Sequence, residues 1–114
     1  MNLPKIPTLA EFQNKKQHQK DLEERKLQQR KDASRDLLPK MIEDVIKDLD
    51  YIMDDGSCYI QFGDRYYDVS LDFCAELLNE QFKLQKADYL IAKCETDYHS
   101  GFTNLIVRKK TSEW

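Results

Sequence analysis

The first third of the chain contains too few apolar residues to build a hydrophobic core. Nine consecutive polar residues, 13–21, separate Phe12 from Leu22, and the apolar residues of this third form no continuous stripe at helical spacing. Helices in folded proteins gain most of their stability by packing such a stripe against a core. Thr8 and Glu11 nevertheless form a capping box, the signature of a helix start. We therefore predict a long, solvated helix that protrudes from the rest of the protein.

The remainder of the chain has the apolar patterns of a folded domain. They first predict a helix at 37–53, with Asp36 as its N-cap and Pro39 in its first turn. A hairpin follows, made of a strand at 57–62, a turn at Gly63 and Asp64, and a return strand at 65–69. The last predicted elements are a helix at 71–86 capped by Ser70 and two strands at 89–95 and 102–109. This order predicts an α+β fold of two layers, a small antiparallel sheet packed by two amphipathic helices. Residues 1–33 form the predicted polar, basic helical arm, and residues 34–114 form the compact α+β domain.

The last two predicted strands are apolar on both of their faces, at residues 89–92 and 105–107. A sheet with one face in water alternates apolar and polar residues, so we expect these strands to be covered on both sides. The two amphipathic helices account for one cover. The other is the arm, a second copy of the protein or a different partner.

Charge is sorted along the chain. Residues 1–35 carry nine Lys and Arg against five Asp and Glu, residues 36–80 carry three against twelve, and residues 81–114 carry six against four. Segregation of this kind predicts electrostatic partners more than it predicts catalysis.

The sequence contains no catalytic motif, and we predict no enzyme activity, cofactor or metal site. Cys94, Asp97 and His99 form the one tight cluster of reactive side chains, which we interpret as a core cysteine beside an exposed turn. Cys58, Cys74 and Cys94 are interpreted as reduced core residues of an intracellular protein. Three widely spaced glycines exclude a Gly-rich phosphate loop. No segment has the length and hydropathy of a membrane span or signal peptide, so we expect a cytoplasmic protein without a membrane partner.

The candidate partner-binding residues fall into three groups. The basic group on the arm is Lys15, Lys16, Lys20, Arg25, Lys26, Arg30 and Lys31. The acidic group, which could imitate the phosphates of nucleic acid, is Asp68, Asp72, Glu76 and Glu80. The aromatic group is Tyr66 and Tyr67, of a type enriched at interfaces, and the C-terminal Trp114 is a further candidate anchor.

The layout of residues 34–110, an amphipathic helix followed by hairpin, helix and hairpin behind a polar arm, resembles small accessory proteins of double-stranded DNA phages and large DNA viruses. The resemblance implies an accessory role in the host cell cytoplasm. Our leading hypothesis is a non-enzymatic protein that acts through protein–protein contact or self-association, as an assembly component or an inhibitor. The alternatives are nucleic-acid binding through the basic arm and inhibition by an acidic surface that mimics DNA.

Overall fold

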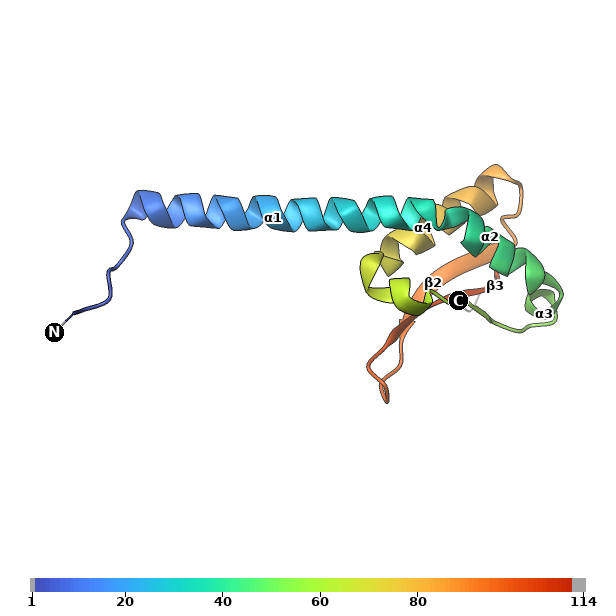
Figure 1. Cartoon of the computed structure of the whole chain (residues 1–114). Coiled ribbons are helices and arrows are strands. Elements are labelled where there is room, and N and C mark those ends of the chain that lie inside the picture. The colour runs from blue at the N-terminus through green and yellow to red at the C-terminus, as the bar shows by residue number, and fades with distance from the viewer. Residues whose placement is uncertain (1, 112–114) are drawn as a thin grey trace.

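The computed structural model describes residues 2–111, in which a long helix extends from a compact domain with a three-stranded antiparallel sheet (Figure 1). The helices are α1 (Leu9–Asp36), α2 (Leu38–Lys47), α3 (Leu49–Met53), the 3-10 helix η1 (Gly63–Asp68) and α4 (Leu71–Leu84), and the strands are β1 (Cys58–Tyr59), β2 (Leu90–Thr96) and β3 (Thr103–Lys109). The predicted α+β class, with a small antiparallel sheet and a protruding helix, is confirmed. The projection of α1 gives the molecule principal extents of 72 × 33 × 29 Å.

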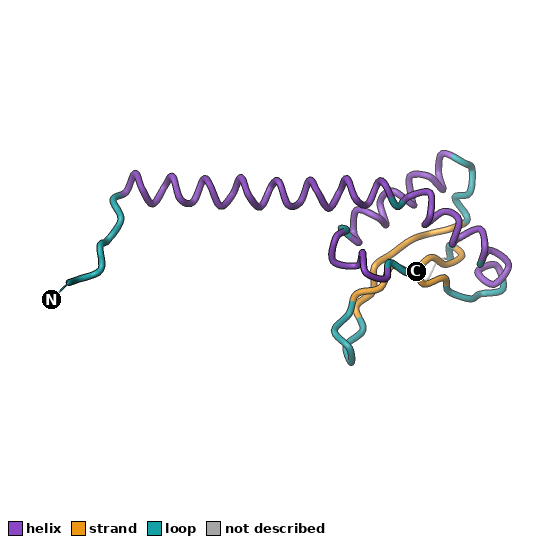
Figure 2. Tube along the Cα trace, viewed as in Figure 1, coloured by secondary structure: helices purple, strands orange, loops and turns teal. Residues whose placement is uncertain are grey.

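Strand β3 lies at the centre of the sheet, between β1 and β2. Helices α3 and α4 pack on the sheet, and α2 packs beside α4 (Figure 2). Leu105 and Val107 belong to the core that these helices cover. Ile106 is also buried, with 2% of its surface exposed, although alternation along β3 places it on the opposite face. Tyr59 and Lys93 flank it in register, and α1 makes its main contacts with α4, η1 and α2, so the arm is not the principal cover of this second face.

Helix α4 also covers the free edge of β2. The side chain of Asn79 donates from Nδ2 to the carbonyl of Ala92 at 2.9 Å, and its Oδ1 accepts the Ala92 amide at 2.8 Å. One amide side chain thus replaces a neighbouring strand for that residue, which leaves no bare backbone there for another chain to pair with.

The helix predicted at 37–53 is divided by a turn at Asp48 into α2 and α3. The turn redirects the second piece so that Ile52 is fully buried and α3 contacts β3. Asp36 does not cap α2, because it is the last residue of α1, and Leu37 occupies the cap position without a side-chain hydrogen bond. Pro39 does lie in the first turn of α2, as predicted.

The hairpin predicted across Gly63 and Asp64 is wrong. Residues 65–69 do not return as a strand, because the segment from Gly63 to Asp68 winds into η1, and β1 pairs with β3 instead. Arg65 and Asp68, three residues apart, form an ion pair of 3.3 Å that suits a helical turn. The later strands agree with expectation, as do two of the three predicted helix caps: Thr8 and Ser70 accept hydrogen bonds from the amides three residues onward.

Candidate functional site

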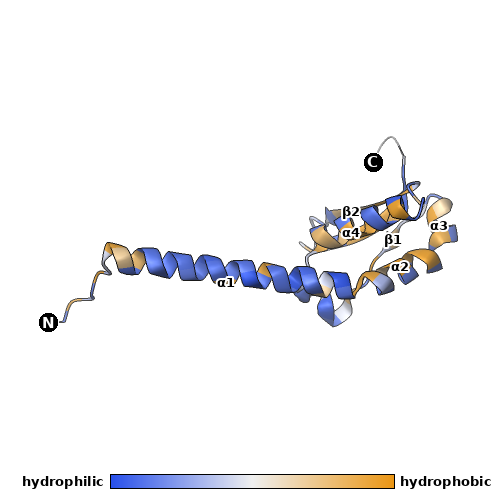
Figure 3. Cartoon of the chain, turned by 90° about the horizontal axis from the view of Figure 1, so that it is seen from above, coloured by the Kyte–Doolittle hydropathy of each residue, from blue (hydrophilic) through white to orange (hydrophobic). Residues whose placement is uncertain are grey.

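Helix α1 meets the domain only at its C-terminal end. Every residue from 2 to 30 is exposed, and the helix continues without a break across residue 33 into the packed region. Figure 3 shows the shaft of α1 as hydrophilic, with apolar residues at its N-terminal tip. Ser34 is completely buried and joins α1 to the start of α4: its hydroxyl donates to the carbonyl of Arg30 at 2.7 Å and accepts the amide of Ser70 at 3.1 Å.

Two cations on α1 hold an aromatic ring on α4. The Lys31 ammonium lies 5.4 Å from the centre of the Phe73 ring, and the Arg35 guanidinium carbon lies 4.9 Å from it. Such contacts are attractive through the ring quadrupole. Lys31, which the sequence places in the partner-binding group, therefore already has a role in attaching the arm.

The angle between α1 and the domain holds two adjoining open hollows of about 330 Å³ each. We call this region the inner corner. Arg30 and Tyr67 line both hollows, and Tyr67 is 73% exposed. The remaining lining residues are Lys26, Gln29, Ala33, Arg65, Tyr66, Asp68, Val69, Ser70, Leu71, Asp72 and Thr103. The corner is thus a mixture of basic, acidic and aromatic side chains rather than a region of one charge.

An aromatic cluster fixes one wall of the inner corner. The Tyr66 hydroxyl donates to the carbonyl of Thr103 at 2.9 Å and accepts its amide at 3.1 Å, which ties η1 to the first residue of β3. The rings of Tyr67 and Phe102 lie edge-on to that of Tyr66, with centroids at 4.9 and 5.9 Å. Tyr66 is therefore held in place, while Tyr67 and Phe102, whose rings contact it, remain exposed.

The structure brings six of the predicted partner-binding residues to the inner corner: Lys26, Arg30, Tyr66, Tyr67, Asp68 and Asp72. The others lie elsewhere, and Trp114 lies outside the described residues. Lys15, Lys16, Lys20 and Arg25 are exposed along the shaft of α1, and Glu76 and Glu80 are exposed on α4. The basic and acidic groups, which are distant in sequence, therefore meet in one chain at the base of the arm.

The cysteines lie in surroundings that disfavour the thiolate. Burial, and after it the carboxylate of Asp48, raises the pKa of Cys58 to about 12. Burial and then Asp72 raise the pKa of Cys94 to about 12, and burial also raises the pKa of Cys74. His99 lies on the exposed turn between β2 and β3, where its amide donates to Asp97 Oδ1. Within residues 2–111 no group of three or more His, Cys, Asp or Glu side chains is arranged to hold a metal ion.

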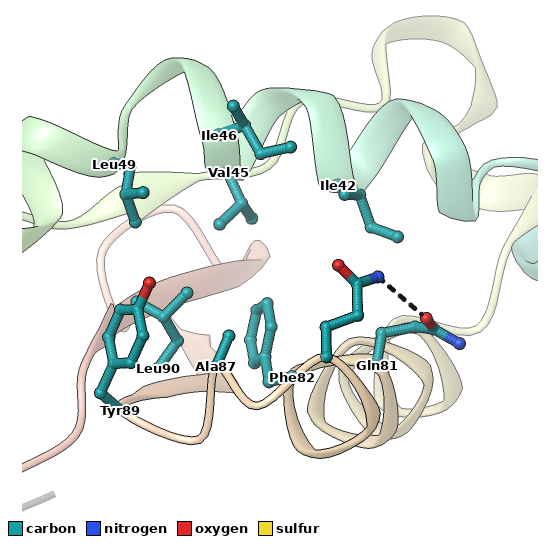
Figure 4. Close-up of a pocket in the computed structure, with 10 residues that line it drawn as sticks. Ile42, Val45, Ile46, Leu49, Gln81, Phe82, Ala87, Tyr89 and Leu90 are labelled. Carbon is teal, nitrogen blue, oxygen red and sulfur yellow. Dashed lines mark hydrogen bonds between the residues drawn. The ribbon is translucent and has the colours of Figure 1, made fainter.

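Sequence reasoning missed an apolar groove of about 250 Å³ between α2, the end of α4 and the start of β2 (Figure 4). One wall is formed by Ile42, Val45 and Ile46 of α2 and by Leu49, the first residue of α3. The other residues that line the groove are Gln81, Phe82, Gln85, Ala87, Tyr89 and Leu90. Ile46 belongs to the apolar stripe of the helix predicted at 37–53, but the structure leaves it 64% exposed at the rim. No signal in the sequence marks this groove, because Ile46 follows Ile42 at the same four-residue spacing by which the buried Val45 follows Met41.

Comparison with protein-family models, with curated proteins and with solved structures gives no match to this chain. Across the described part of the chain no helix has the length and hydropathy to cross a membrane.

Proposed function

We propose that this chain is a non-enzymatic protein that acts by binding another protein, as an assembly component or inhibitor of the kind encoded by phages and large DNA viruses. One observation carries the proposal: the exposure of every residue from 2 to 30, most of which belong to α1. A helix without a packed face gains little stability from its own sequence. Contact with a partner supplies the missing burial.

The inner corner supports the same function. Tyrosine and arginine are over-represented among the residues that dominate binding energy at protein interfaces. Arg30 and the exposed Tyr67 stand at the junction of two hollows, beside the clamped ring of Tyr66. A partner element lying along α1 would meet these side chains where the arm joins the domain.

Affinity capture from the cells that produce the protein tests this proposal. The full chain is compared with a variant that lacks residues 2–24, all of which are exposed, so the variant retains every buried residue. We expect a protein that the full chain retains and the shortened chain loses. The double variant Arg30→Ala, Tyr67→Ala should retain less of it, whereas Tyr98→Ala, on the turn between β2 and β3, should behave as the full chain does.

Equal capture by the full and shortened chains would contradict the proposal, because the arm would then have no part in binding. Recovery of nucleic acid that is released as salt increases would replace it with the nucleic-acid alternative, since phosphate contacts weaken steeply with ionic strength.

A further inference from the structure

The tip of the arm carries a regular set of exposed apolar side chains. Leu3, Ile6, Leu9 and Phe12 recur at every third position, and their exposed fractions range from 46% to 86%. Residues 2–8 precede α1 and have no regular secondary structure. A polyproline II helix has three residues per turn, so Leu3 and Ile6 share one edge in that conformation, whereas Leu9 and Phe12 lie about one turn apart on the surface of α1. Pro4 and Pro7 fix φ in the range this conformation needs.

The apolar groove between α2 and α4 has the properties of a site for such an edge. Its volume, about 250 Å³, lies below the roughly 300–1,000 Å³ of small-molecule pockets. It suits one or two aliphatic side chains of a peptide instead. Ile46 and Tyr89 stand exposed on opposite rims, where a bound segment would cover them (Figure 4).

The charges around the two elements are complementary. Residues 2–20, which hold the apolar tip, contain four lysines and one glutamate. Residues 38–55, which form the α2 wall of the groove and continue through α3, contain six Asp and Glu against two lysines. No charged side chain lines the groove itself, and residues 81–90 of the other wall contain two lysines and one aspartate, so the two wall segments together stay net acidic. A basic segment is attracted to acidic surroundings, and this attraction directs the encounter as well as adding affinity.

The tip cannot reach the groove of its own chain. The 28 residues of α1 span about 42 Å at 1.5 Å per residue. The seven residues from 2 to 8 extend at most about 25 Å. Because α1 points away from the domain, the tip and the groove stay at opposite ends of one molecule (Figure 1).

We propose that residues 3–12 of one copy occupy the α2–α4 groove of a second copy of this chain. The inference rests on the proposed function and names the partner as the protein itself. Tip and groove are different surfaces, so the contact is heterologous: it either closes as a reciprocal exchange of arms between two copies or continues from copy to copy.

Sedimentation velocity of the full chain over a thousandfold range of concentration tests the proposal. We expect the mass to rise with concentration. Ile6→Asp at the tip and Ile46→Asp at the rim should each raise the dissociation constant by about tenfold or more, the cost of losing one buried aliphatic side chain. Both positions are exposed, so both variants should keep the circular dichroism of the parent chain.

A mixture of the two variants gives the sharpest result. Ile6→Asp retains an intact groove and Ile46→Asp retains an intact tip, so one productive contact remains between them. The mixture should therefore form a species of two chains at concentrations where each variant alone is monomeric. Leu22→Asp on the shaft and Tyr98→Asp on the turn are matched controls that should associate as the full chain does.

Three results would overturn the proposal: a full chain that is monomeric throughout, association unchanged in Ile46→Asp, or a mixture that stays monomeric. Each is distinct from failure of the proposed function. A monomeric chain whose arm still captures another protein refutes the second copy as partner and leaves the protein-binding function standing.

Discussion

Ser34 holds the base of the arm to the domain, and it is the one polar residue fully buried within residues 2–111. Substitution Ser34→Ala would leave the Ser70 amide without its acceptor. We expect a loss of about 1–3 kcal/mol in the free energy of unfolding, the cost of an unsatisfied buried group. Urea denaturation measures it. Ser100→Ala, on an exposed turn, should change stability by less than about 0.5 kcal/mol, and an equal loss in both variants would contradict the role of Ser34.

The raised pKa of Cys58 predicts that the folded protein loses stability at alkaline pH. Burial, followed by Asp48, raises its pKa in the folded protein to about 12, against an ordinary value near 9. The unfolded chain therefore loses the thiol proton first, and the stabilisation is complete below pH 9 and declines as pH rises toward 12. The difference in unfolding free energy between the parent chain and Cys58→Ala should shrink over that interval. Urea titrations at several pH values measure it, and a difference independent of pH would contradict the assignment.

Single residues were predictable where their partners are close in sequence. The caps at Thr8 and Ser70 bond to amides three residues away, so a local pattern contains the whole interaction. Ser34 acts across 36 residues, and no local pattern marks it as buried. The exposure of Ile46 likewise depends on how far apart α2 and α4 lie.

At the scale of elements, α4, β2 and β3 were predicted with shifts of only one or two residues at their ends, because each has a self-contained apolar pattern. The segment of η1 was not. The strand pattern at residues 65–69 is short. Hydrogen bonds from the Tyr66 side chain to Thr103 of β3 replace the backbone pairing that the expected strand would have made. The division between α2 and α3 was also missed because it depends on a contact that is distant in sequence, the burial of Ile52 against the sheet.

Tyr66→Phe tests how η1 is attached. The variant keeps the ring contacts but loses both hydrogen bonds to Thr103. We expect the Thr103 amide to exchange with solvent deuterium faster, with a stability loss of about 1 kcal/mol. Tyr67→Phe, whose ring is exposed, is the matched control and should leave exchange at Thr103 unchanged. Equal exchange in the two variants would mean that the Tyr66 hydroxyl does not hold this junction.

For the whole molecule, the sorted charge has a structural counterpart. Sequence alone indicated a basic arm and an acidic domain surface, and the structure places Lys26 and Arg30 of the former beside Asp68 and Asp72 of the latter. Which residues of each group would meet was not predictable, because it depends on the direction in which α1 leaves the domain. The groove was not predictable either, since its two walls are formed by residues 42–49 and 81–90, which are distant in the sequence.

The extended shape is the feature on which both proposals depend, and small-angle X-ray scattering measures it. A compact chain of 114 residues has a radius of gyration of about 13 Å, whereas this structure has 20.0 Å over its Cα atoms. Ile6→Asp, chosen to suppress association, should give a value near the larger figure. Removal of residues 2–24 should lower it to about 12 Å, the value for a compact chain of the remaining length.

The same scattering data distinguish an exposed arm from a folded one. A value near 13 Å for Ile6→Asp would mean that α1 lies against its own domain, so that its exposed residues already have a partner within the chain. The requirement for an outside partner, and the argument that the tip cannot reach its own groove, would then both fail. A value near 20 Å leaves residues 2–30 without intramolecular burial, which is the condition that makes binding to another chain favourable.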